Sequence, residues 1–133
     1  MSSRLGEPVT DWKTRPNSVR AKRIYDPVDA VDGLRLLVTQ YWPRGVARTA
    51  VDEYVRVLGP SRSLLQAFRS GEIAWREYKT HYLAEMRGEA QQAEIHRLAK
   101  LSRHQNVTVM CVCPDESHCH RSLLRELIAR FDD

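Results

Sequence analysis

The chain has 133 residues and a mass of 15.4 kDa, which is the size of one domain, and 42% of its residues are hydrophobic. This composition excludes a wholly disordered chain, and no apolar run approaches the ~20 residues of a membrane helix. The N-terminus also lacks the apolar segment of a secretory signal. We therefore expect a soluble, cytoplasmic domain without membrane contact.

The positive charge is concentrated at the N-terminus. The formal net charge is +4, and residues 1–25 alone, with six basic and two acidic side chains, carry the whole excess. We interpret residues 1–20 as a polar, basic arm and residues 21–133 as a single domain. A basic arm can contact phosphate, so a nucleic-acid-binding module is one hypothesis, and a solvated tail is the other.

Two strands are predicted in the first third of the chain. Residues 20–25 form a short apolar and basic segment that ends at Asp26-Pro27, and residues 34–41 (LRLLVTQY) read as a buried strand. Between them, Asp32-Gly33 is a hairpin-type turn signal. The second strand is followed by a loop, Trp42-Pro43-Arg44-Gly45.

Helices are predicted in the middle of the chain. Thr49 and Asp52 resemble a capping box that opens a helix through Leu58, and Ser61 caps a second helix that ends at Gly71. Apolar spacing predicts further helices over residues 73–87 and 89–104, with Gly88 between them. The aromatic stripe of the third helix is typical of core packing; it contains Trp75, Tyr78 and Tyr82.

The clearest strand covers residues 107–113 (VTVMCVC), and an apolar stripe after it predicts a last helix that reaches Phe131. Strands that alternate with helices indicate an α/β fold: a small sheet of few strands, mostly parallel, with helices around it. An α+β fold with a hairpin at Asp32-Gly33 is the alternative. In an α/β sheet, we expect the binding crevice at the C-terminal strand-to-helix junction.

That junction, residues 111–121, contains most of the chemistry. If Asp115 or Ser117 caps the last helix, the first turn holds His118, Cys119, His120 and Arg121. Spacing places His120 toward the sheet with Leu124, and Arg121 on a more exposed face with Arg125. Basic residues oppose the dipole of a helix start, and a bound anion would remove that penalty. A small anionic ligand, of phosphate or nucleotide type, is therefore the first hypothesis.

Two other chemistries use the same residues. A zinc ion or another transition metal could bind Cys113, His118, Cys119 and His120, although their spacing is not that of a zinc knuckle. No other cofactor is indicated. His118-Cys119 with Arg125 also matches the pattern of cysteine phosphatases, but the intervening residues contain no glycine. Cys111 and Cys113 also fit as small buried hydrophobic residues instead of reactive thiols. The sequence therefore leaves open whether the protein is an enzyme.

The loop after the second strand extends the predicted site. Trp42 and Arg44 follow a buried strand, as the 118–121 segment does, so we expect both segments to reach one pocket. Trp42 would form a wall and Arg44 would bind an oxyanion. The alternative is that Trp42 belongs to the core and Arg44 to a solvated loop. Oligomeric state, ligand identity and pathway have no signal in the sequence.

Several motifs resemble the YeaO-like family of bacterial domains of unknown function, from about residue 20 to the C-terminus. They are RIYDP (23–27), DGLRLLV (32–38), YWPRGV (41–46), GPS (59–61), WREY (75–78) and YLAE (82–85). The resemblance implies a small α/β domain and no established activity. This chain has Thr39-Gln40 where family members usually have Asp-Arg. It also has Cys119-His120-Arg121 where many have Asn-His, which leaves His120 as the common element.

Overall fold

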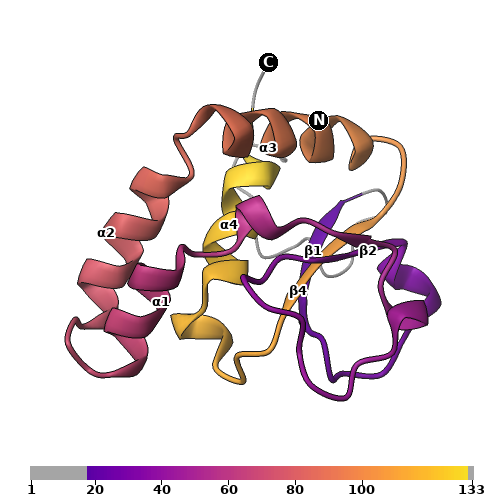
Figure 1. Cartoon of the computed structure of the whole chain (residues 1–133). Coiled ribbons are helices and arrows are strands. Elements are labelled where there is room, and N and C mark those ends of the chain that lie inside the picture. The colour runs from indigo at the N-terminus through magenta and orange to yellow at the C-terminus, as the bar shows by residue number, and fades with distance from the viewer. Residues whose placement is uncertain (1–17, 132–133) are drawn as a thin grey trace.

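The computed structural model describes residues 18–131, and its centre is a four-stranded parallel sheet (Figure 1). The strands are β1 (Val19–Arg23), β2 (Leu34–Leu37), β3 (Glu53–Tyr54) and β4 (Val107–Cys111), in the order β1-β4-β2-β3. The predicted α/β class is confirmed. The alternative hairpin at Asp32-Gly33 is wrong, because β4 lies between β1 and β2 and pairs with both in parallel.

β4 takes the central place because its residues suit burial on both faces. All five of its residues are buried, and it contains no charged side chain, no glycine and no proline. The segment before β2 is turned by a short 3-10 helix, Ala30–Asp32, and by Gly33, whose φ is 64°. The backbone N–H of Leu34 then donates to the carbonyl of Asn106 at 2.9 Å, which starts the pairing with β4.

Four helices pack around the sheet: α1 (Arg62–Arg69), α2 (Trp75–Glu85), α3 (Glu89–Leu101) and α4 (His120–Ala129). Figure 1 shows α1 and α2 together on one side of α4, and α3 across one end of the molecule. Ser61 caps α1 by accepting from the N–H of Leu64, and Gly88 precedes α3, both as predicted. Helix α4 is central to the packing, since it contacts β1, β4, α2 and α3.

The prediction of a helix after Thr49 is wrong. That segment forms a 3-10 turn (Arg48–Ala50), the short strand β3 and a second 3-10 turn (Arg56–Leu58). The reason is tertiary: the N–H of Asp52 donates to the carbonyl of Arg35, and its carboxylate accepts the N–H of Arg35 at 2.8 Å. Asp52 therefore extends the sheet edge instead of capping a helix.

The two faces of the sheet carry different cores. Alternate residues such as Leu36, Val107 and Val109 join the helices in the larger core, whereas Leu37 and Met110 face the other way. There they pack with Ile24 and with partly buried side chains that include Trp42 and Tyr54. One face is thus covered by helices and the other by the loops near Trp42.

The predicted N-terminal arm lies almost entirely outside the described residues, since β1 begins at Val19. Within residues 18–131, no helix is long and apolar enough to cross a membrane.

Candidate functional site

A cavity of about 500 Å³ lies where β2 and β4 end. Because the two strands are parallel neighbours, the segments that follow them meet at the same edge of the sheet. The lining comes from the loop after β2, from the β4–α4 connection and from α1 and α2. Five of the six predicted ligand-binding residues line it: Trp42, Arg44, His118, Cys119 and His120. The cavity brings the two predicted segments together, and ligand binding by them stays a prediction.

Arg121, the sixth, does not line the cavity, and its expected outward orientation is wrong. Its side chain is only 3% exposed, and Nη1 lies 3.2 Å from Cys111 Sγ and 3.6 Å from Cys119 Sγ. Nη1 also donates to the carbonyl of Cys113. Arg125 is buried as well, and its Nε donates to the carbonyl of Val19 at 3.0 Å. Both side chains are buried because α4 is covered by β1, β4, α2 and α3. Each guanidinium group therefore donates to a backbone carbonyl, Cys113 for Arg121 and Val19 for Arg125.

The start of α4 also differs from the prediction. Asp115 caps a separate 3-10 turn (Glu116–His118), the chain is extended at Cys119, and α4 begins only at His120. His118 and Cys119 therefore precede the first turn of α4. His118 is exposed, with Nδ1 2.9 Å from a carboxylate oxygen of Asp115. Hydrogen bonds from Ser117 and His118 lower the pKa of Asp115 to about 2.

His120 faces the sheet, as the spacing with Leu124 predicted. Its Nε2 lies 2.6 Å from the carbonyl oxygen of Val38, just after β2. A carbonyl can only accept, so Nε2 carries a proton, and in the neutral ring the lone pair is on Nδ1. Nδ1 lies 3.9 Å from Cys119 Sγ, and the ring packs 5.5 Å from that of Tyr82. The imidazole is thus held in one orientation, with its free nitrogen toward the sulfur of Cys119.

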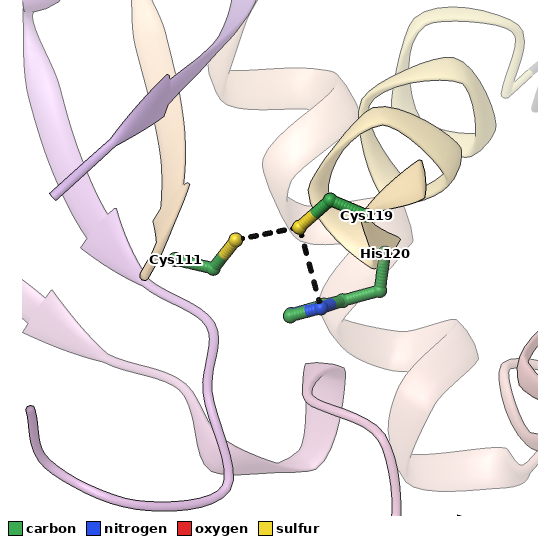
Figure 2. A group of neighbouring side chains, drawn as sticks. All are labelled: Cys111, Cys119 and His120. Carbon is green, nitrogen blue, oxygen red and sulfur yellow. Dashed lines mark hydrogen bonds between the residues drawn. The ribbon is translucent and has the colours of Figure 1, made fainter. Parts of the chain in front are cut away.

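Two buried thiols meet beside His120. The Sγ atoms of Cys111 and Cys119 are 2.7 Å apart, and neither cysteine is in a disulfide (Figure 2). The hydrogen bond with Cys119, and after it the nearby His120 and Arg121, lower the pKa of Cys111 against the opposing effect of burial. The hydrogen bond with Cys111 and burial raise the pKa of Cys119. The two thiols therefore share a buried hydrogen bond, and the surroundings of Cys111 favour its thiolate form.

This charge state agrees with the surroundings of Arg121. Within residues 18–131, no carboxylate pairs with its buried guanidinium, which is always charged. A buried charge without a partner is costly, so the guanidinium of Arg121 favours the thiolate form of Cys111 beside it.

The metal-binding set predicted from the sequence is only half assembled. Cys119 and His120 lie together, but the half-buried Cys113 directs its Sγ toward the carbonyls of Asp115 and His118, at 3.7 Å from each. Cys111 takes their place: its Sγ, the Cys119 Sγ and a His120 ring nitrogen lie within 4.8 Å of one another. The burial of Cys111 was expected from its strand. Its contact with Cys119 was not, because the β4–α4 connection creates that contact.

The phosphatase-like arrangement is not formed. Cys119 lines the cavity, but the guanidinium of Arg125 is held at β1 through the carbonyl of Val19. The arginine that such a site needs is therefore engaged elsewhere.

Sequence reasoning missed several lining residues that come from α1 and α2. Phe68 and Tyr78 have ring centroids 4.5 Å apart, and Arg69 lies beside them on the lining. Tyr82 of the same aromatic stripe is core, as expected, and its hydroxyl donates to the carbonyl of Leu58. Tyr78 is core as well, with only 2% of its surface exposed, and it also lines the cavity, which helical spacing alone does not show.

The fold and the cavity define a small α/β domain with a parallel sheet and a thiol-containing pocket at the strand ends. The model of the family DUF488-N3a, described as "Active DUF488-N3 subclade", matches residues 19–131. A protein of Escherichia coli named "Uncharacterized protein YeaO" is 32% identical over 111 residues, which cover 82% of this chain and 95% of that protein. The chain therefore belongs to this YeaO-like family.

A second relative is more distant. The "Uncharacterized protein Rv3073c" of Mycobacterium tuberculosis is 28% identical over 116 residues, which cover 86% of this chain and 96% of that protein. No solved structure matches the chain.

Proposed function

We propose that the cavity binds a small anionic ligand, of phosphate or nucleotide type. The observation that carries this proposal is the convergence of the Arg44 loop and the start of α4 on one cavity of about 500 Å³. That volume is within the range of small-molecule sites, about 300–1,000 Å³. A helix start attracts anions through its free N–H groups and its dipole, and the side chain of Cys119 does not cap α4.

Arg44 supplies a positive charge to the lining of the proposed site. It is exposed, and within the described part of the chain its guanidinium forms no ion pair, while its carbonyl accepts from the Tyr25 hydroxyl at 2.9 Å. The backbone is thus held while the charged group is free to bind. An arginine fork suits the paired oxygens of a phosphate or carboxylate.

Aromatic side chains favour a ligand that also carries a ring. The lining includes Tyr41, Trp42, Phe68 and Tyr78. Within residues 18–131, the Tyr78 hydroxyl has no hydrogen-bond partner, so it can bond to a ligand. Flat aromatic walls with charged groups at the mouth match a nucleotide better than a bare inorganic ion. The family description, "active", supports catalysis without naming a reaction.

A thermal-shift screen with phosphate, sulfate and nucleotides tests the proposal. We expect a ligand that raises the melting temperature of the full chain at millimolar concentration. Arg44→Ala should weaken its binding about 10- to 150-fold, since a charge-assisted hydrogen bond contributes about 1.5–3 kcal/mol. The melting temperature without ligand should not change, because Arg44 is exposed.

Arg87→Ala is the matched control. Arg87 is also an exposed arginine, but it does not line the cavity, so its loss should leave affinity unchanged. The proposal is wrong if none of these anions shifts the wild-type melting temperature, or if the two variants lose affinity equally.

A further inference from the structure

The three side chains of Figure 2 form a soft-donor cluster that anion binding does not explain. Cys111 ends β4, Cys119 precedes α4, and His120 is the first residue of α4. All three are buried, yet all three contribute to the lining of the cavity. Two thiols and an imidazole are the donor types that bind zinc and other thiophilic ions.

The orientation of His120 is that of a metal ligand. Histidines that bind metals usually donate their other ring N–H to a carbonyl or carboxylate, which fixes the ring and its tautomer. Here Nε2 donates to the carbonyl of Val38 at 2.6 Å, and the lone pair of Nδ1 is directed to the thiol pair. The backbone after β2 therefore makes Nδ1 the nitrogen that the neutral ring offers to a metal.

The distances fit a zinc ion after a small adjustment. Zinc binds sulfur at ~2.3 Å and nitrogen at ~2.0–2.1 Å, so tetrahedral ligands lie roughly 3.5–3.8 Å apart. Nδ1 of His120 and Sγ of Cys119 are already 3.9 Å apart. The two sulfurs, at 2.7 Å, would have to separate by about 1 Å.

We propose that Cys111, Cys119 and His120 bind a zinc ion through two Sγ atoms and Nδ1, with the fourth coordination position open to the cavity. Three protein ligands and one open position are typical of a catalytic zinc site, whereas structural sites are closed by four protein ligands. Zinc binds each cysteine as a thiolate, so every proton that the two thiols carry before binding is released to solvent. The Arg121 N–H that contacts Cys111 Sγ becomes an outer hydrogen bond to a zinc ligand.

This site is distinct from one built on Cys113 and His118. The Sγ of Cys113 lies near two backbone carbonyls, and His118 pairs with Asp115. Neither belongs to the cluster within 4.8 Å. Cys113→Ser is therefore a matched control that removes a thiol two residues from Cys111 without removing a ligand.

The test uses the full chain, reduced, freed of metal with a chelator and titrated with Co²⁺ as a spectroscopic probe. We expect the absorption of a tetrahedral cobalt–thiolate centre that saturates at about one ion per chain, and loss of that absorption when Zn²⁺ is added. Cys113→Ser should retain the signal. Cys111→Ser and Cys119→Ser should lose it, with circular dichroism to confirm that each variant is folded.

A thiol count on wild type gives a second readout that needs no variant. With Zn²⁺ bound, a disulfide reagent should modify Cys113 alone, and after chelation it should also modify Cys111 and Cys119 from the cavity, more slowly because both are buried. The proposal is overturned if Co²⁺ produces no thiolate absorption in wild type, if Cys113→Ser loses it as Cys119→Ser does, or if Zn²⁺ does not protect two thiols. The titration contains no phosphate or nucleotide, so its result does not depend on the proposed anion site.

Discussion

Arg121 is a permanent charge in a buried position, and its hydrogen bonds go to sulfur and to one carbonyl. We expect Arg121→Ala to lower the free energy of unfolding by about 3 kcal/mol, because it removes a buried side chain and leaves the Cys111 sulfur and the Cys113 carbonyl without their partner. Urea unfolding followed by circular dichroism measures this difference.

Arg130→Ala is the control at the end of the same helix. Arg130 is 68% exposed and pairs with Glu126 at the surface, so its loss should cost less than about 1 kcal/mol. Equal stability of the two variants would contradict the buried role that the structure gives Arg121.

His120 and Arg121 show what helical spacing can and cannot predict about a side chain. Spacing correctly placed His120 toward the sheet, because Leu124 marks that face. It also placed Arg121 and Arg125 on one face of the helix, but it predicted that face to be exposed. Both side chains are in fact buried. A helix pattern shows which residues lie on the same face. It does not show that α2, α3 and the strand ends cover the rest of α4.

At the scale of elements, local signals succeeded where nothing competed with them. Ser61 caps α1, and its bonds to Glu85 of α2 do not compete, because the hydroxyl donates to Glu85 while it accepts from the N–H of Leu64. Gly88 separates α2 from α3. The similar signal at Thr49 and Asp52 did not form a helix, because Asp52 bonds to Arg35 on β2. The partner lies 17 residues away in sequence, which a local pattern cannot reveal.

The turn into β2 requires a glycine for two reasons. Gly33 has a φ of 64°, and a Cβ there would lie 2.1 Å from the carbonyl oxygen of Asn106. Gly45 also has a positive φ, 79°, but a Cβ there would have nothing within 4 Å. We expect Gly45→Ala to cost about 1–2 kcal/mol from backbone strain alone. Gly33→Ala should cost at least twice as much, because it also disrupts the pairing of β2 with β4.

Thermal unfolding of the two variants measures the comparison. A Gly33→Ala protein as stable as Gly45→Ala would show that the Asn106 contact is not tight.

At the scale of the whole molecule, the cavity is a product of topology. Its lining comes from segments as far apart as Tyr25 and His120, which meet because parallel strands end at the same edge of the sheet. The sequence could predict that the segments after β2 and β4 reach one pocket, since both follow apolar strands. It could not predict the contributions of α1 and α2, because no local pattern determines where these helices pack.

The sheet is also linked by a buried carboxylate, and this gives a pH dependence. Asp32 accepts from Lys22 of β1 at 3.0 Å and pairs with Arg35 of β2, while its carbonyl accepts from Thr108 of β4 at 2.7 Å. Burial opposes ionisation of Asp32, but the hydrogen bonds from Lys22, from the backbone N–H of Asp29 and from Arg35, together with the charge of Lys22, outweigh it and lower the pKa.

A carboxyl whose pKa is lower in the folded protein stabilises it at pH values above the unfolded pKa, about 3.9, and loses this effect as pH falls through the folded value. Asp32→Asn should therefore lower the free energy of unfolding at pH 7 by about 1–3 kcal/mol. The difference from wild type should shrink as the pH falls below about 4, because wild-type Asp32 then becomes protonated. Urea unfolding of both proteins between about pH 3 and pH 7 follows this change. Glu72→Gln, at an exposed position, should match wild type throughout. A difference between Asp32→Asn and wild type that stays constant with pH would mean that the ionised carboxylate does not hold the three strands together.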